Sequence, residues 1–184
     1  MYHPFLIGEK VYLRGVERKD LEGDYFQWLN DYEVTKFTEV GRFPNTKESM
    51  DEYYHEVAIS GRHTFFAIID KVTDLHIGNT KLGPIDWYHR KATVGLMIGN
   101  KEYWGKSYGT EAMKLIVEYG FIRLGLNKIW SALIYTNKAS QRMCENAGFI
   151  VEGCDRSSLL FRGDYYDALY VGITRDDFLK GYNK

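Results

Sequence analysis

The chain has few cysteines and prolines, no long apolar run and almost no net charge. Its two cysteines, Cys144 and Cys154, form neither a disulfide framework nor the spacing of a zinc site. The net charge of −1 leaves no electrostatic footprint for a nucleic acid, and no apolar run approaches the ~20 residues of a membrane helix. The first residues show no basic segment followed by an apolar one. We therefore expect a cytoplasmic protein with no nucleic-acid and no membrane partner.

Apolar and aromatic residues are plentiful and follow the periods of helices and strands. Hydrophobic residues make up 45% of the 184, enough for one domain with a substantial core. Asp20 is expected to cap a helix, and a polar tail with a helical turn is expected at the end. The pattern predicts helices over 20–31, 47–60, 110–122 and 137–146, and strands over 9–14, 63–70, 75–86, 92–99, 129–135, 149–161 and 165–173. This order predicts a mixed α/β (α+β) domain with helices on both faces of the sheet.

The segment from Gly99 to Gly120 joins an apolar strand to an amphipathic helix through a loop with Gly105, Ser107 and Gly109. The first N–H groups of a helix lack partners within it, and the positive end of the helix dipole lies behind them, so such a junction can hold a phosphate. Gly109 is expected to leave room for a ligand that approaches closely. The same turn is also a common structural connection, so the loop alone does not establish a site.

A second segment, which follows the next predicted strand, favours a binding role for this loop. The loop reads W-G-K-S-Y-G-T-E-A from Trp104, and the second segment reads N-K-A-S from Asn137, followed by E-N-A-G-F from Glu145. Together they resemble the pyrophosphate loop, R/Q-x-x-G-x-G/A, and the N-x-x-S…G-F segment of the GNAT superfamily of N-acetyltransferases. The stretches W-L-N-D-x-E-V and R-G-x-x-x-D are similar to the branch of ribosomal-protein alanine acetyltransferases and amino-sugar acetyltransferases.

The resemblance implies one GNAT-type domain over 1–184, with a twisted, mostly antiparallel sheet of about six to seven strands that is splayed in the middle. It implies acetyl-CoA as co-substrate and no metal. The pyrophosphate would lie on main-chain N–H groups, and the pantetheine arm would pair like an extra strand. The residues expected at the cofactor are Met97, Ile98, Gly99, Trp104, Gly105, Lys106, Ser107, Tyr108, Gly109, Thr110, Asn137, Ser140 and Arg142.

The chain departs from the family's pattern at four positions, two in the loop and two at catalytic residues of other members. Trp104 stands at the Arg/Gln position of the loop, and Ser107 at the first motif glycine, where its N–H and hydroxyl remain able to bond a phosphate. Cys144 occupies the position of the tyrosine that protonates the leaving thiolate in many members. Thr93 occupies the position of a glutamate that some members use as a base.

Acetyl transfer needs a neutral amine, a stabilised oxyanion and a thiolate that can leave. The expected oxyanion donor is the N–H near Ile98, and Asn137 is expected to position the thioester. Cys144 is the candidate acid. The candidate bases are Asp86, His89, His76 and Glu39, and each also has a structural interpretation as a turn, link, core or loop residue. The aromatic residues Trp87, Tyr88, Tyr103 and Trp104 would either line the acceptor cleft or pack in the core.

The favoured function is acetyl transfer from acetyl-CoA to a primary amine by direct attack in a ternary complex. A small-molecule amine is preferred, an amino sugar on a nucleotide carrier in particular, because the acidic residues form no run suited to a basic protein or a polyamine. The alternatives are acetylation of a protein N-terminus or a polyamine, and a non-catalytic acyl-CoA-binding module. The protein is expected to form, if any oligomer, a homodimer. The absence of G-x-x-x-x-G-K-[ST] and G-x-G-x-x-G excludes P-loop and dinucleotide-binding enzymes.

Overall fold

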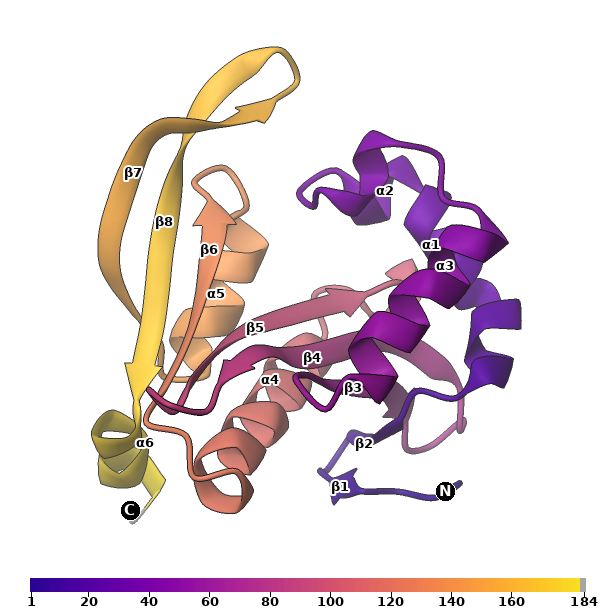
Figure 1. Cartoon of the computed structure of the whole chain (residues 1–184), viewed down its shortest axis with the longest axis horizontal. Helices are drawn as coiled ribbons and strands as arrows, with labels where there is room; N and C mark the ends of the chain where they lie inside the picture. Colours follow the sequence, from indigo (N-terminus) through magenta and orange to yellow (C-terminus); the bar gives the residue numbers. More distant parts are fainter. Residues whose placement is uncertain (183–184) are drawn as a thin grey trace.

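The computed structural model describes residues 1–182, which form one eight-stranded sheet with helices on both faces (Figure 1). The strand order is β1-β2-β3-β4-β5-β6-β8-β7. The strands are β1 (Leu6–Ile7), β2 (Val11–Gly15), β3 (Thr64–Asp70), β4 (His76–Asp86), β5 (Lys91–Ile98), β6 (Lys128–Ile134), β7 (Ile150–Phe161) and β8 (Asp164–Thr174). All neighbours are antiparallel except β5 and β6. The predicted mixed α/β class is confirmed, with the short β1 as an additional strand.

The parallel pair β5–β6 divides the sheet into two wings. Its register covers only three positions, which join Lys91–Thr93 of β5 to Lys128–Trp130 of β6. Beyond these positions the two strands diverge, and the wing of β6, β8 and β7 stands away from the wing of β1–β5 (Figure 1). The expected splay is therefore present. Its narrow end lies where both strands begin, and it widens toward their carboxyl ends.

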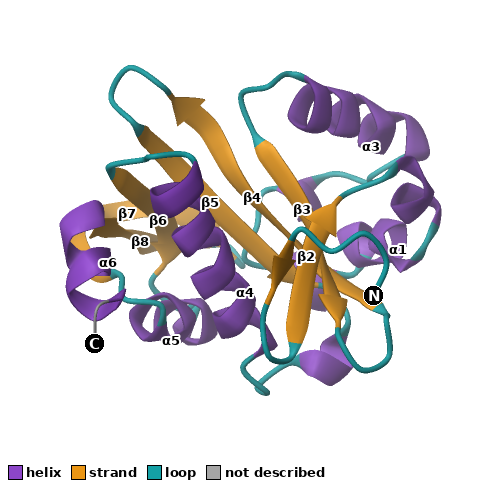
Figure 2. Ribbon diagram, turned by 90° about the horizontal axis from the view of Figure 1, so that it is seen from below, coloured by secondary structure: helices purple, strands orange, loops and turns teal. Residues whose placement is uncertain are grey.

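Each face of the β1–β5 wing has its own apolar core. On one face, α4 (Tyr108–Glu118) continues into a wide turn over Tyr119–Arg123 and packs beside α5 (Lys138–Asn146). The opposite face carries α1 (Asp24–Asn30), α2 (Tyr32–Thr35) and α3 (Lys47–Tyr54). Figure 2 shows α4, α5 and α6 (Arg175–Tyr182) on one side of the molecule and α1 and α3 on the other. We call these the α4 face and the α3 face.

Strand alternation sends neighbouring residues to opposite faces. Leu13 and Ile68 belong to the core on the α4 face, and Tyr12 and Ile69 to the core on the α3 face. Helix α4 buries Ala112, Met113, Ile116 and Val117, the stripe expected of an amphipathic helix. Between residues 1 and 182, no helix is long and apolar enough to cross a membrane.

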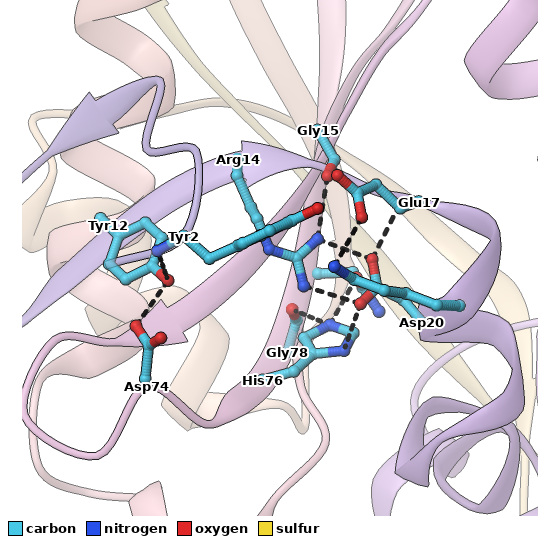
Figure 3. Close-up of polar contacts among 11 residues, drawn as sticks. Tyr2, Tyr12, Arg14, Gly15, Glu17, Asp20, Asp74, His76 and Gly78 are labelled. Carbon is cyan, nitrogen blue, oxygen red and sulfur yellow. Dashed lines mark hydrogen bonds and ion pairs between the residues drawn. The ribbon is translucent and has the colours of Figure 1, made fainter.

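The first predicted helix differs from the structure. It is divided at Gly23, whose extended backbone separates a 3-10 turn (Arg18–Glu22) from α1. Asp20 does not cap α1 as expected, because its carboxylate is buried and accepts two 2.7 Å hydrogen bonds from the Arg14 guanidinium (Figure 3). The predicted polar tail is largely the helix α6, and its last two residues lie outside the described part of the chain.

Candidate active site

A cavity of about 530 Å³ occupies the gap between β5 and β6. Its lining comes from both faces of the sheet. The α4 face contributes residues of α4, α5 and β6, including Met113, Leu133 and Cys144. The α3 face contributes residues of α1, α3, β3 and β4 and of the segment 37–45. Because the cavity passes through the sheet, two ligands that enter from opposite faces can meet inside it.

The edge of β5 turns main-chain groups toward this gap, and among them the Ile98 carbonyl oxygen accepts from the Trp104 indole at 2.7 Å. Gly99 N–H donates to Ile77 O at 2.9 Å, which makes Ile98 and Gly78 a non-hydrogen-bonded pair of the β4–β5 ladder. Antiparallel alternation then directs the N–H and C=O groups of Ile98 and Leu96 away from β4, and both residues lie beyond the last position of β5 that pairs with β6, so these groups face the gap. An extended polar chain can pair with this edge as a further strand would. This is the expected position of the pantetheine arm.

Met97, Ile98 and Gly99 do not contribute equally to this edge. Ile98 has its main chain in the gap, whereas the Gly99 N–H is already bonded to β4. A Cβ on Gly99 would overlap the indole of Trp28, so this glycine allows α1 to approach the sheet. Met97 lines the cavity through its side chain, which packs against the core of the α3 face.

The loop before α4 has the backbone of an anion-binding turn. Gly105 and Ser107 both adopt left-handed φ angles, of 71° and 68°, and α4 begins at the next residue after Ser107. Ser107 is the N-cap residue, but its hydroxyl does not cap the helix. The N–H groups from Tyr108 to Thr110, at the first turn of α4, therefore remain available, with the positive end of the helix dipole behind them. This arrangement fits a pyrophosphate.

Contacts with the β1–β2 turn hold this loop in place. Lys10 Nζ donates to Lys106 O at 3.1 Å, and Glu111 Oε1 accepts from the N–H groups of Lys10 and Val11 at 2.8 and 3.2 Å. Lys10 was not expected at the site, since nothing in the sequence connects residues 96 positions apart. Its ammonium and that of Lys106 add positive charge beside the loop.

Gly109 has a different role from the expected one. A Cβ at this position would lie 3.1 Å from Met143 Sδ, 3.4 Å from Ile98 Cγ1 and 3.5 Å from Leu96 Cδ2. These atoms belong to α5 and β5, not to an open space. Gly109 therefore allows the start of α4 to pack closely onto the neighbouring elements, and the expectation of a ligand directly at this Cα is corrected.

Helix α5 brings Asn137, Ser140 and Cys144 to the cavity wall. Asn137 is the N-cap residue, and its Oδ1 accepts from Ser140 N at 3.1 Å. Within residues 1–182 the amide NH2 of Asn137 donates to no protein acceptor, so it is available to donate to a ligand. Arg142 faces solvent and does not line the cavity.

Cys144 is a poor proton donor. Its side chain is buried, and burial raises the pKa of the thiol to about 11, helped by the charge of Glu145. An ordinary thiol titrates near 8.5, so transfer of a proton from Cys144 to a leaving thiolate is uphill. The thiol lines the cavity wall mainly as a small apolar group.

The structure does not bring Asp86 and His89 to the cavity. Both lie at the turn between β4 and β5, at the narrow end of the splay, where β5 still pairs with β6. Asp86 Oδ1 accepts from His89 N at 2.9 Å, so its carboxylate stabilises the turn. Thr93 Oγ1 donates to Gly83 O at 2.6 Å and is likewise part of this hairpin.

The other two candidate bases also have structural partners. The ring of His76 is bonded to Gly78 O and Asn79 Oδ1, next to the Arg14–Asp20 pair (Figure 3). Burial lowers the pKa of His76 despite the opposing charge of Asp20. Glu39 is exposed and lies 3.7 Å from Arg42, although its neighbours Thr38 and Val40 do line the cavity.

The aromatic residues of the cavity differ from those expected. Trp87 and Tyr88 face solvent, Tyr103 packs edge-on against Tyr108, and the Trp104 indole donates to Ile98 O. None of these four lines the cavity. Its aromatic lining is Tyr25, Phe37, Tyr53 and Phe65. Their helical or strand spacing indicates burial but does not distinguish a core from a cavity wall, so the sequence alone does not reveal them.

Comparison with known proteins agrees with this geometry. The sequence profile of the acetyltransferase (GNAT) domain matches residues 10–150. The uncharacterized N-acetyltransferase p20 of Bacillus licheniformis is 27% identical over 94% of this chain and 97% of its own. The spermidine N(1)-acetyltransferase of Escherichia coli is 28% identical over 92% of this chain and 88% of its own. The structure of a spermidine N-acetyltransferase from Vibrio cholerae, in complex with CoA and spermine, superimposes with a TM-score of 0.83 at 23% identity, over 92% of this chain and 98% of that one.

Proposed function

The chain belongs to the GNAT family of acetyl-CoA-dependent N-acetyltransferases, and we propose that it acetylates the primary amine of a small molecule by direct attack in a ternary complex. The cavity that passes through the sheet between β5 and β6 carries this proposal. Acetyl-CoA would bind from the α4 face, along the edge of β5 and the loop before α4. The acceptor would bind from the α3 face. Holding both in line can lower the barrier by about 7–11 kcal/mol at best.

The chain's own groups supply orientation and charge stabilisation. The N–H of Ile98 faces the gap and would donate to the thioester oxygen as negative charge develops there. The amide of Asn137 would hold the pantetheine chain from the opposite wall. Direct attack is favoured over an acetyl-enzyme because Cys144, the cavity's one thiol among residues 1–182, is kept protonated by burial.

Proton transfer in this proposal uses water. The cavity lining in the described chain includes no carboxylate and no imidazole. The amine would therefore react as the neutral form and pass its proton to water at the open mouth. Asp86, His89 and Cys144 would have no direct part in this step.

For the acceptor we propose an amino sugar on a nucleotide carrier. Tyr25, Tyr53 and Phe65 offer aromatic faces, and Asn45 and Ser49 offer polar atoms, a combination that suits a sugar or a base. The stretches W-L-N-D-x-E-V and R-G-x-x-x-D support the branch with ribosomal-protein alanine and amino-sugar acetyltransferases. The second candidate is a polyamine, favoured by the similarity to spermidine N(1)-acetyltransferases along most of the chain.

A thiol-release assay with acetyl-CoA tests this function. The acceptors are a uridine-diphosphate-linked amino sugar, spermidine and a peptide with an N-terminal alanine, and CoA binding is measured separately by calorimetry. Saturable release with the sugar nucleotide supports the proposal. Faster release with spermidine would select the second candidate. Binding of CoA without release from any amine would indicate an acyl-CoA-binding module instead.

A further inference from the structure

Lys81 lies on the acceptor side of the cavity. It belongs to β4, and its register partners are Phe65 on β3 and Gly95 on β5. Paired residues of a sheet share one face, and Phe65 packs with the core of the α3 face. Gly95 has no side chain, and the stem of Lys81 passes 3.9 to 4.0 Å from where its Cβ would be. The lysine therefore reaches over the part of β5 where the gap opens.

Aromatic rings from two elements hold the ammonium group there. Lys81 Nζ lies 4.9 Å from the centre of the Tyr53 ring, and Tyr53 in turn meets Phe65 edge-on at 5.9 Å. A ring face attracts a cation but leaves its hydrogen-bond donors unused. All three side chains line the cavity. The position of the charge is thus fixed by its surroundings, while its N–H groups remain available.

No carboxylate of residues 1–182 neutralises this charge. None lies within 4.0 Å of Lys81 Nζ, and Lys81 is the one side chain with a full charge in the cavity lining of the described chain. A polyamine acceptor would bring several positive charges into a cavity that already holds one. An acceptor with a negative group would supply the missing partner.

We propose that Lys81 selects acceptor amines that carry a phosphate or carboxylate group, and that it disfavours polyamines. This rests on the proposed acetyl transfer. The Lys81 ammonium would donate to the anionic group and so orient the acceptor. The same positive charge would disfavour the ammonium form of the acceptor amine, because like charges repel, and would raise the fraction of the neutral nucleophile.

Paired acceptors test the proposal. Glucosamine is compared with glucosamine 6-phosphate for the phosphate group, hexylamine with 6-aminohexanoate for the carboxylate, and spermidine stands for polycations. We expect at least one anionic member to exceed its neutral partner in kcat/KM by about tenfold or more, the effect of a charge-assisted hydrogen bond. The pair with the larger ratio of kcat/KM between its anionic and neutral members shows whether Lys81 prefers a phosphate or a carboxylate group. Lys81→Gln and Lys81→Met should abolish the ratio, and Lys81→Arg should retain most of it.

Lys91→Gln is the matched control, since it removes the same charge from an exposed position of β5 outside the cavity. Calorimetric binding of the same acceptors to the CoA-loaded protein provides a readout that does not depend on turnover. If no acceptor releases thiol but the anionic ones still bind through Lys81, the acetyl-transfer function fails and the selectivity stands. Equal affinity and rate for anionic and neutral partners, a preference of the wild type for spermidine, or a ratio unchanged by Lys81→Gln would overturn the proposal.

Discussion

The indole N–H of Trp104 donates to the carbonyl oxygen of Ile98 at 2.7 Å, across the end of β5. That carbonyl points into the gap where β6 no longer pairs with β5. Trp104 therefore satisfies one group of the strand edge and at the same time attaches the loop before α4 to it. Trp104, a departure from the family's loop motif, thus connects the two parts of the proposed cofactor site.

Trp104→Phe should weaken this connection. The lost hydrogen bond should lower the free energy of unfolding by about 0.5–1.5 kcal/mol, nearer the lower value because Trp104 is 40% exposed. CoA should bind several-fold more weakly, since the loop is less firmly oriented. Urea unfolding and calorimetric titration with CoA measure the two effects. Trp87→Phe, at an exposed tryptophan outside the cavity, should change neither, and an unaltered CoA affinity in Trp104→Phe would refute the assigned role.

Gly105→Ala and Gly109→Ala should both be destabilising, for different reasons. At Gly105 the space for a Cβ is open but φ is 71°, so the cost of about 1 kcal/mol is backbone strain within the loop. At Gly109 the methyl group would press on Met143 and Ile98, with a cost of about 1–3 kcal/mol from overpacking. Thermal unfolding compares them. A Met143→Ala background should relieve the Gly109 variant and leave the Gly105 variant unchanged, and equal rescue of both would contradict the distinction.

Asn137 should contribute to stability and to binding through different atoms. Asn137→Ala removes the N-cap, which should cost about 1 kcal/mol, and should also raise the KM for acetyl-CoA. Asn137→Asp keeps an oxygen that accepts from Ser140 N but has no amide donor, so stability should recover while the KM remains high. Denaturant unfolding and steady-state kinetics separate the effects. Full kinetic recovery in the Asp variant would show that Asn137 acts only as a cap.

The Arg14–Asp20 pair should make stability depend on acid pH. Burial alone would raise the pKa of Asp20, but its hydrogen bonds from Arg14 and from Glu17 N–H outweigh this and lower it. A carboxyl whose pKa is lower in the folded state stabilises the fold above its unfolded pKa of about 3.9 and loses that effect as the pH falls.

Arg14→Met tests this pair. It should cost about 3–5 kcal/mol at pH 7, because it leaves a buried carboxylate without its cation. In the wild type, the free energy of unfolding should fall between pH 5 and pH 3 as Asp20 takes up a proton. Asp20→Asn should lack this contribution to the fall. Chemical unfolding at several pH values measures both. Arg18→Met removes an arginine from an exposed ion pair and should cost less than about 1 kcal/mol. Identical acid profiles for wild type and Asp20→Asn would contradict the assignment.

The sequence by itself determined the class of fold and the position of the two motif segments within it. Strand alternation, the stripe of α4 and the two motifs depend on residues close in the chain, where spacing and local backbone preference are sufficient. The breaks between the predicted elements around residues 148 and 162–163 depend on the same local preferences, and Gly148, Arg162 and Gly163 have left-handed φ angles in the structure.

Only the tertiary structure decided which side chains meet in the cavity. Tyr53 and Lys81 come from a helix and a strand whose contact depends on how α3 crosses the sheet, and no local pattern encodes that contact. Asp86 and His89 lie close to the cofactor strand in sequence but at the narrow end of the splay, since the direction of β5 carries the chain away from them. Gly109 was expected to make room for a ligand, but the packing of α4 against Met143 of α5 gives it a different role.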